Sequence, residues 1–185
     1  MPPEISKSNM ETSVTEVQEE LSPLSDRDFR IFNHMAVKMD YFHDKFRRSW
    51  NLLWLAATTK TCPQNMEPEK LIDVGLSFAR NLTTHHNIEE AYFFPMLAEK
   101  MPEFQSNQAE LLKQHRDIHA GLDGFVEYLQ SCRRGETELD MIQLKAVMES
   151  WGDVLWTHLD QEVKTISAKN MRRYWTLDDM IRMQI

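Results

Sequence analysis

The sequence predicts an all-α protein, an up-down-up-down four-helix bundle with a flexible N-terminal arm and a short C-terminal helix. Only 5 glycines and 7 prolines occur in 185 residues, which leaves few tight turns for a many-stranded β fold. Four long segments repeat their apolar residues at helical spacing, and short connections join them, as in an antiparallel bundle. A hydrophobic content of 42% with 27% charged residues is ordinary for one globular domain of this length.

The chain divides into an arm and a bundle. Residues 1–26 are rich in Ser, Thr, Glu and Pro and lack periodic hydrophobic residues, so they cannot bury enough apolar surface to offset ordering. We expect residues 1–26 to be a flexible arm and residues 27–185 to form the bundle.

The first two helices are expected over residues 26 to about 58 and roughly 68 to 94. Ser25 and Asp26 resemble an N-cap for the first, and Pro95 lacks an amide donor and should end or kink the second. On each helix one face repeats at helical spacing and is expected to point into the bundle; we call it the apolar stripe. The stripe of the first helix is Phe32, Met35, Ala36, Met39, His43, Phe46, Trp50 and Leu53. The stripe of the second helix is Leu71, Val74, Phe78, Leu82, His85, Glu89 and Phe93.

The third helix follows Pro102 and should stop at Arg133-Arg134-Gly135, where cations precede a capping glycine. The fourth is expected over about 137–168. Thr176 with Asp179 three residues later resembles a capping box that opens the short terminal helix. The apolar stripe of the third helix is Leu111, His115, Ile118, His119, Leu122, Phe125, Val126 and Leu129. The stripe of the fourth helix is Leu144, Val147, Trp151, Leu155, His158, Glu162 and Ile166.

The apolar stripes carry metal-binding side chains. Residues four apart lie on one helix face, so each pair can direct two donor groups at one point. Such groups are costly to bury unless they are paired or bound to a metal. The pattern predicts a metal site at the centre of the bundle. The candidate ligands are His43 and the pairs His85–Glu89, His115–His119 and His158–Glu162.

Other polar residues near these positions are expected to face elsewhere. His34 lies nine residues from His43, which rotates it to the opposite, more solvated face of the helix. The pair His86–Glu90 is rotated by about 100° from His85–Glu89. Glu90 is expected to be solvated. His86 stays ambiguous, because a neighbouring helix could make it an extra ligand or a support for one.

The number of donors indicates the metal. Five imidazoles and two carboxylates exceed what one tetrahedral zinc uses, and they suit two first-row metals, bridged by the carboxylates, of the non-haem iron type. The Glu-x-x-His motif of carboxylate-rich di-iron bundles is absent from the sequence, and so is HExxH.

The order His, HxxxE, HxxxH, HxxxE resembles the hemerythrin family, in its HHE cation-binding branch. The segments HHNIEEAYFFPML (85–97), HLDQEVKTI (158–166) and RRYWTLDDM (172–180) resemble fungal hemerythrin-like proteins. The resemblance implies one iron at His115, His119 and His158, and a second at His43 and His85 with an open position for dioxygen. Glu89 and Glu162 would bridge the irons together with an oxo or hydroxo group.

Two departures distinguish the chain from the oxygen carriers of that family. The carriers have an Asp five residues after the last histidine, where this chain has Val163, and Glu162 takes the role from one residue earlier. His86 adds a potential ligand beside the site, as an adjacent carboxylate does in the iron-sensing F-box relative.

The resemblance implies a di-iron protein that activates dioxygen, as an oxidase or oxygenase on a small molecule, for example in specialised metabolism. The alternatives are a non-catalytic dioxygen- or iron-binding, storage or sensing protein, and a structural bundle with incidental histidines. An enzyme needs a pocket of about 300 Å³ or more beside the open iron, whereas a carrier admits only oxygen.

The expected surroundings follow from composition. A net charge of −8 argues against a nucleic-acid partner, and the longest apolar run, residues 52–57, is too short to span a membrane. Cys62 and Cys132 form no CxxC motif, and no secretory signal opens the chain, so free thiols and a cytoplasmic location are expected.

Overall fold

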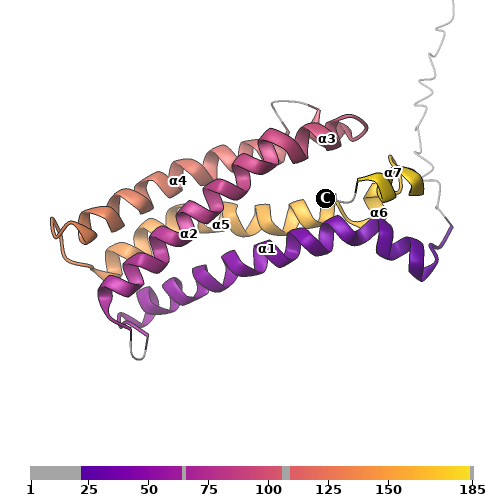
Figure 1. Cartoon of the computed structure of the whole chain (residues 1–185). Coiled ribbons are helices and arrows are strands. Elements are labelled where there is room, and N and C mark those ends of the chain that lie inside the picture. Colours follow the sequence, from indigo (N-terminus) through magenta and orange to yellow (C-terminus); the bar gives the residue numbers. More distant parts are fainter. Residues whose placement is uncertain (1–21, 64–65, 106–108, 184–185) are drawn as a thin grey trace, which may run out of the picture.

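The computed structural model describes residues 22–63, 66–105 and 109–183, and every described element is helical. The predicted flexibility of the arm falls largely on residues 1–21, which lie outside the described residues. Four long helices lie side by side along most of the molecule (Figure 1). They are α1 (Asp26–Thr59), α2 (Pro68–Ile88), α4 (Glu110–Arg133) and α5 (Met141–Thr165).

The four helices form a closed ring in which α1 contacts α2, α2 contacts α4, α4 contacts α5, and α5 returns to α1. This arrangement confirms the predicted bundle. Two short helices, α6 (Ala168–Met171) and α7 (Leu177–Arg182), pack against α1 at the end where α1 begins (Figure 1). None of the helices in the described part of the chain is both long and apolar enough to cross a membrane.

The helix ends follow local capping chemistry. The Ser25 side chain accepts a hydrogen bond from the Asp28 amide at the start of α1, and Gly135 adopts φ 72° just after α4. The expected capping box of Thr176 and Asp179 opens α7. The fourth helix begins later than expected, at Met141, because the Asp140 side chain accepts from the Ile142 amide and caps it there.

The second helix was expected to end or kink at Pro95, and its geometry changes just before that residue. A π-helical turn, η1 (Glu89–Phe93), is followed by α3 (Phe94–Ala98) and a short 3₁₀ turn, η2 (Pro102–Phe104). In η1 the Phe94 amide donates to the carbonyl of Glu89, five residues back. The wider turn accommodates one extra residue. Phe94 is therefore buried, and the expected core residue Phe93 is only partly buried.

The interior consists of two apolar clusters separated by a polar layer. One cluster is built around Trp50, Phe78 and Trp151, and the other around α3, α6, α7 and the first turns of α1. Trp50 and Trp151 meet edge to face with ring centroids 4.9 Å apart. Glycines allow these close approaches: a Cβ on Gly121 would lie 2.3 Å from Trp151, and one on Gly152 would lie 2.9 Å from Trp50. The candidate metal ligands occupy the layer between the clusters.

Candidate metal centre

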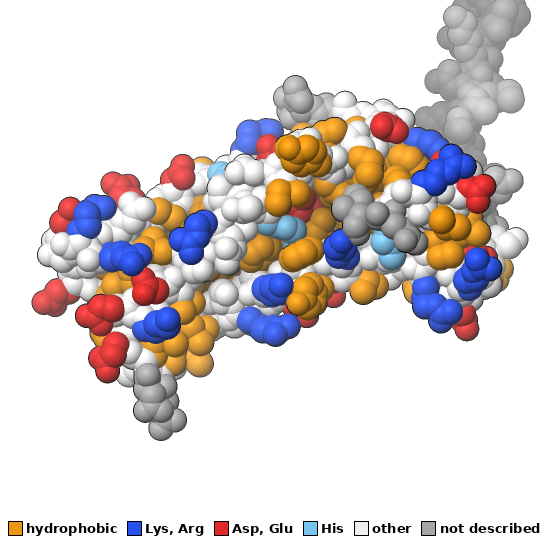
Figure 2. All heavy atoms as spheres, viewed as in Figure 1, with side chains coloured by type: hydrophobic (Ala, Val, Ile, Leu, Met, Phe, Trp, Pro, Cys, Tyr) orange, Lys and Arg blue, Asp and Glu red, His pale blue; other side chains and the backbone are white. Residues whose placement is uncertain are grey.

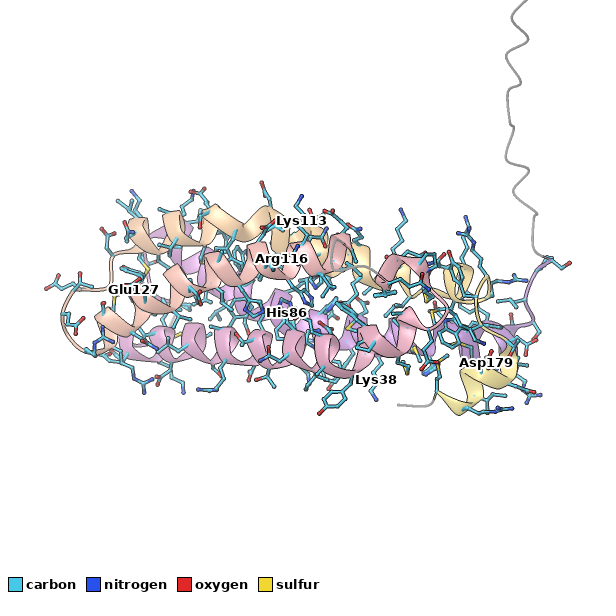
Figure 3. All side chains as sticks on the ribbon, turned by 90° about the horizontal axis from the view of Figure 1, so that it is seen from above. Lys38, His86, Lys113, Arg116, Glu127 and Asp179 are labelled. Carbon is cyan, nitrogen blue, oxygen red and sulfur yellow. The ribbon has the colours of Figure 1, made fainter. Side chains whose placement is uncertain are left out.

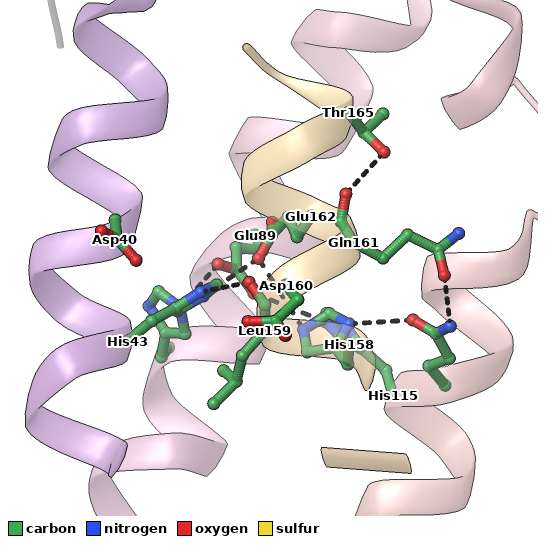
Figure 4. Close-up of polar contacts among 12 residues, drawn as sticks. Asp40, His43, Glu89, His115, His158, Leu159, Asp160, Gln161, Glu162 and Thr165 are labelled. Atoms are coloured by element: carbon green, nitrogen blue, oxygen red, sulfur yellow. Dashed lines mark hydrogen bonds and ion pairs between the residues drawn. The ribbon is translucent and has the colours of Figure 1, made fainter. Parts of the chain in front are cut away.

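The polar layer lies midway along the bundle and receives side chains from all four long helices. His43 comes from α1, His86 from α2, His115 from α4, and His158 from α5, and each has no exposed surface. Figure 3 shows His86 inside the bundle, and Figure 4 shows the histidines and glutamates converging. On each helix a buried apolar residue lies about one turn before the ligand, so burial of that helix face also brings the polar group inside; these residues are Met39, Leu82, Leu111 and Leu155.

The described side chains place their metal-binding atoms in two groups. The first comprises His86, Glu89, His115 and His158. The second comprises His43, His85, Glu89 and Glu162, and within each group the ligand atoms lie within 4.8 Å of one another. Glu89 belongs to both groups, so the two sets of atoms are neighbours.

Both carboxylates reach from one group towards the other. Glu89 Oε1 lies 2.8 Å from His85 Nε2, and its Oε2 lies 3.5 Å from His115 Nε2. Glu162 Oε2 lies 3.1 Å from His43 Nε2 and 3.7 Å from His158 Nε2. This arrangement could hold two neighbouring cations, with the two carboxylates between them.

Three imidazoles are oriented by hydrogen bonds at Nδ1, which leave Nε2 directed into the centre. His43 Nδ1 lies 3.0 Å from the Leu159 carbonyl, and His115 Nδ1 lies 2.7 Å from Glu90 Oε1. His158 Nδ1 lies 3.3 Å from Gln114 Oε1, and the Gln114 amide in turn donates to the Gln161 side chain at 2.9 Å. Partners of this kind fix the tautomer and the ring orientation of metal-binding histidines.

His86 has a histidine as its outer partner. Its Nδ1 lies 3.4 Å from His119 Nε2, and its own Nε2 points inward without a hydrogen-bond partner. The His86 ring stacks on that of His115, with centroids 3.9 Å apart. His119 is only partly buried and belongs to neither group of ligand atoms. His86 therefore occupies the position at which the sequence led us to expect His119.

Unpartnered buried atoms show that the residues fit a bound cation. Nε2 of His43, His85 and His86 and all four carboxylate oxygens of Glu89 and Glu162 are buried without a hydrogen bond. Buried polar groups of this kind are normally satisfied, so seven in one place call for a ligand that accepts lone pairs. A pair of cations would satisfy all of them.

Electrostatics favour the same conclusion. Burial lowers the pKa of His85 to about 3, and it lowers the pKa values of His86 and His158 well below the ordinary histidine value. Burial also lowers the pKa of His115, against the opposing effect of Glu90. These four imidazoles are thus neutral and ready to bind a metal. Burial, followed by the neighbouring Glu162, raises the pKa of Glu89, a cost that a cation would reverse.

The structure brings together six of the seven residues proposed as ligands from the sequence. They are His43, His85, Glu89, His115, His158 and Glu162. Sequence reasoning missed the supporting roles of Glu90, expected to be solvated, and of Gln114. The sequence signal for Glu90 is Pro95, which disturbs the regular helix before it and so changes the face on which Glu90 lies.

An apolar groove of about 560 Å³ opens beside the second group of ligands. Among the candidate ligands, His85 and Glu89 line it. Its walls are the side chains of α1 on one side and of α2, η1 and α3 on the other. Figure 2 faces this part of the surface, where hydrophobic side chains gather around the histidines with lysines or arginines at their margin.

Comparison with known proteins places the chain in a family of cation-binding domains. The family model for the hemerythrin HHE cation binding domain matches residues 34–169. The chain is 28% identical over 155 residues to the dimeric xanthone biosynthesis cluster protein R11 of Cryptosporiopsis sp. (strain 8999). The match covers 77% of this chain and 55% of that protein, so the chain spans about half the length of this relative. No solved structure matches the chain. With the matched segment containing every residue of the centre, the chain belongs to the hemerythrin HHE cation-binding domain family.

Proposed function

We propose that the protein holds two iron ions and activates dioxygen to oxidise a small organic molecule. Two observations together carry the proposal. Two adjoining ligand groups have Glu89 in common, and a groove large enough for a substrate reaches one of these groups. An oxygen carrier needs no such groove, whereas small-molecule sites of enzymes commonly have ~300–1,000 Å³. The name of the similar fungal protein assigns that protein to a xanthone biosynthesis cluster, which supports a biosynthetic role here.

We propose that His86, His115 and His158 hold one iron, that His43 and His85 hold the other, and that Glu89 and Glu162 bridge them. His86 takes the place that the sequence suggested for His119, because its free Nε2 points into the centre. His119 supports His86 from outside through the 3.4 Å contact at Nδ1.

Bound iron would supply the redox chemistry with dioxygen, and the protein residues would control access and orientation. An iron at His86, His115 and His158 would be held by side chains without exposed surface, which would keep water and substrate away on that side. His85, with a side chain 13% exposed, lies where the groove meets the centre. A molecule in the groove would therefore approach the second iron first.

The test is to reduce the iron-loaded protein without oxygen and then mix it with dioxygen. Two irons per chain, uptake of dioxygen and rapid return to the ferric state are expected. A stable coloured adduct that releases its oxygen under vacuum would make the protein a carrier, and a single zinc per chain would exclude the di-iron centre.

Two carboxylate variants on α5 sharpen the test. Glu162→Gln should lower the iron content and slow the reaction with dioxygen, because Glu162 lies between the two groups. Asp160→Asn is the matched control, since Asp160 is exposed and pairs with Arg47 at 2.7 Å. Equal losses in both variants would contradict the proposed centre.

A further inference from the structure

The first group of ligands holds its imidazoles firmly. Each of its three histidines is fully buried and has a side chain of the protein at its Nδ1. The pairs are His86 with His119, His115 with Glu90, and His158 with Gln114. Outer partners fix the orientation of a metal-binding imidazole, so this position is arranged for a cation before one arrives.

The second group is more open. The side chain of His85 is 13% exposed and lines the groove, so a dissolved cation or a chelator can approach this group from outside. The neighbours of the His85 ring are Phe46 and Phe42, with ring centroids 5.1 and 5.8 Å away. These contacts are apolar and add no negative charge to the imidazole.

One outer partner differs from the others in charge. The partners of the hydrogen-bonded imidazoles are a backbone carbonyl, a histidine, an amide and a carboxylate, and the carboxylate is Glu90. Glu90 Oε1 lies 2.7 Å from His115 Nδ1. A carboxylate that accepts the Nδ1 proton makes Nε2 a stronger ligand and adds a negative charge close to the bound cation. The first group therefore has an electrostatic advantage over the second.

The π-turn η1 brings this partner into place. Glu90 follows Glu89 in the turn; Glu89 is buried at the centre, whereas the Glu90 side chain is 44% exposed and reaches His115 from outside. The His115 ring also stacks against His86 and Phe94, with centroids 3.9 and 5.3 Å away. One short segment thus supplies a carboxylate shared by both groups and the carboxylate that anchors the first.

We propose that the two metal positions are unequal and fill in order. The first group binds its cation first and retains it, because Glu90 anchors and polarises His115, and the second group exchanges its cation through the groove. Glu90 is a positioning residue, since it acts on the metal through His115. The inference rests on the proposed function for the presence of two metal positions, and it requires neither iron nor dioxygen.

Cobalt(II) tests the order, because its visible absorption bands report the number and geometry of its ligands. The metal-free protein is titrated with cobalt(II) in competition with a chelator of known affinity. Two stages are expected, with affinities that differ by about 10-fold or more, the usual effect of an outer partner. Brief treatment of the loaded protein with chelator should remove one cobalt and leave the other. Two equal stages would overturn the inference.

Two ligand variants assign each stage to a position. His43→Ala should remove the weaker stage and keep the tighter one, and His158→Ala should remove the tighter stage. Loss of the tighter stage in His43→Ala, with retention in His158→Ala, would reverse the order and overturn the inference.

The role of Glu90 is tested by its charge. Glu90→Gln keeps the shape and an oxygen acceptor, and it should weaken the tighter stage by about 10-fold; Glu90→Leu removes the acceptor and should weaken it by up to about 100-fold. Both should change the absorption spectrum of the first cobalt and leave the weaker stage nearly unchanged. Glu127→Gln is the control, since Glu127 is an exposed residue near the end of α4, away from His86 (Figure 3). A Glu90→Gln protein with the affinity and spectrum of the unchanged protein would refute the role of the charge.

Failure of this inference and failure of the proposed function give different results. Two equal cobalt stages, together with dioxygen uptake by the iron-loaded protein, would overturn the inference alone. Two unequal stages that respond to Glu90→Gln as expected, with no dioxygen uptake by the iron-loaded protein, would overturn the proposed function alone.

Discussion

At the scale of single residues, the histidines divide into those that point inward and those that support them. His86 and His119 are the informative pair, because they lie in contact and only His86 has an unpartnered nitrogen facing the centre. Sequence reasoning chose His119, since His115 and His119 lie one turn apart on one helix. Spacing within one helix does not show that the ring of His86, from the adjoining helix, lies between His119 and the other ligands.

We expect His86→Ala to lose iron far more than His119→Ala. The first change removes an inward donor, and the second removes a supporting hydrogen bond, which typically costs ~10–100-fold in metal affinity. Iron per chain after desalting, together with competition against a chelator, measures both effects. Full iron loss in His119→Ala with retention in His86→Ala would restore the assignment made from the sequence.

At the scale of helices, most of the fold could be predicted, because helical periodicity and capping residues are local signals. Ser25, Gly135 and the pair Thr176–Asp179 act at their helix ends as expected. The π-turn could not be predicted from periodicity, since a regular helix of 3.6 residues per turn places Phe93 inside where the structure has Phe94.

The contact between α4 and α5 supplies a matched pair of glycine substitutions. Gly121→Ala should destabilise the protein by about 1–3 kcal/mol, because the new Cβ would overlap the base of the Trp151 side chain. Gly124→Ala lies on the same helix with no neighbour within 4 Å, so it should be neutral or stabilise by up to ~1 kcal/mol. The urea concentration at the unfolding midpoint, compared between variants whose unfolding free energy has the same dependence on urea, measures both effects. Equal destabilisation by Gly121→Ala and Gly124→Ala would contradict the close approach of Gly121 to Trp151.

A tyrosine at the connection between α4 and α5 makes the stability of the folded protein depend on pH in the alkaline range. The Tyr128 hydroxyl donates to the Asp140 carbonyl and accepts from its amide, both at 2.8 Å. Burial raises the pKa of Tyr128 to about 12, above an unfolded value of about 10. The stabilisation is therefore complete below pH ~10 and is lost as the pH rises towards ~12.

Tyr128→Phe should lower stability by about 1–2 kcal/mol at neutral pH, through the loss of both hydrogen bonds. The variant should also lose less unfolding free energy than the unchanged protein as the pH rises from ~10 to ~12. Chemical unfolding of both proteins across this range gives the comparison. A decline of the same size in the variant would assign the alkaline transition to other groups.

At the scale of the whole molecule, the polar layer interrupts an otherwise apolar interior. The clusters on either side can each pack without a metal, but the layer between them leaves buried nitrogens and oxygens without partners. Metal binding is therefore expected to contribute to folding as well as to function.

Removing the metal should lower the unfolding temperature by roughly 5–10 °C. A ligand present at 100 times its dissociation constant stabilises by about 2.7 kcal/mol, and each kcal/mol shifts the midpoint by about 2–4 °C at this size. Leu144→Ala, in the apolar cluster away from the centre, should lower both midpoints and preserve the difference between them. Identical midpoints with and without metal would show that the layer is satisfied in another way.

The π-turn also affects how residues of this chain are matched with those of its relatives. Because the turn holds one residue more than a regular helix, a homologue without it should be one residue shorter between the positions of Glu89 and Pro95. An alignment without a gap there would pair buried Phe94 with a residue on another face and shift every position after it. A single-residue gap at 90–93 restores the equivalence, so the length of this short segment identifies which homologues share the geometry around Glu89 and Glu90.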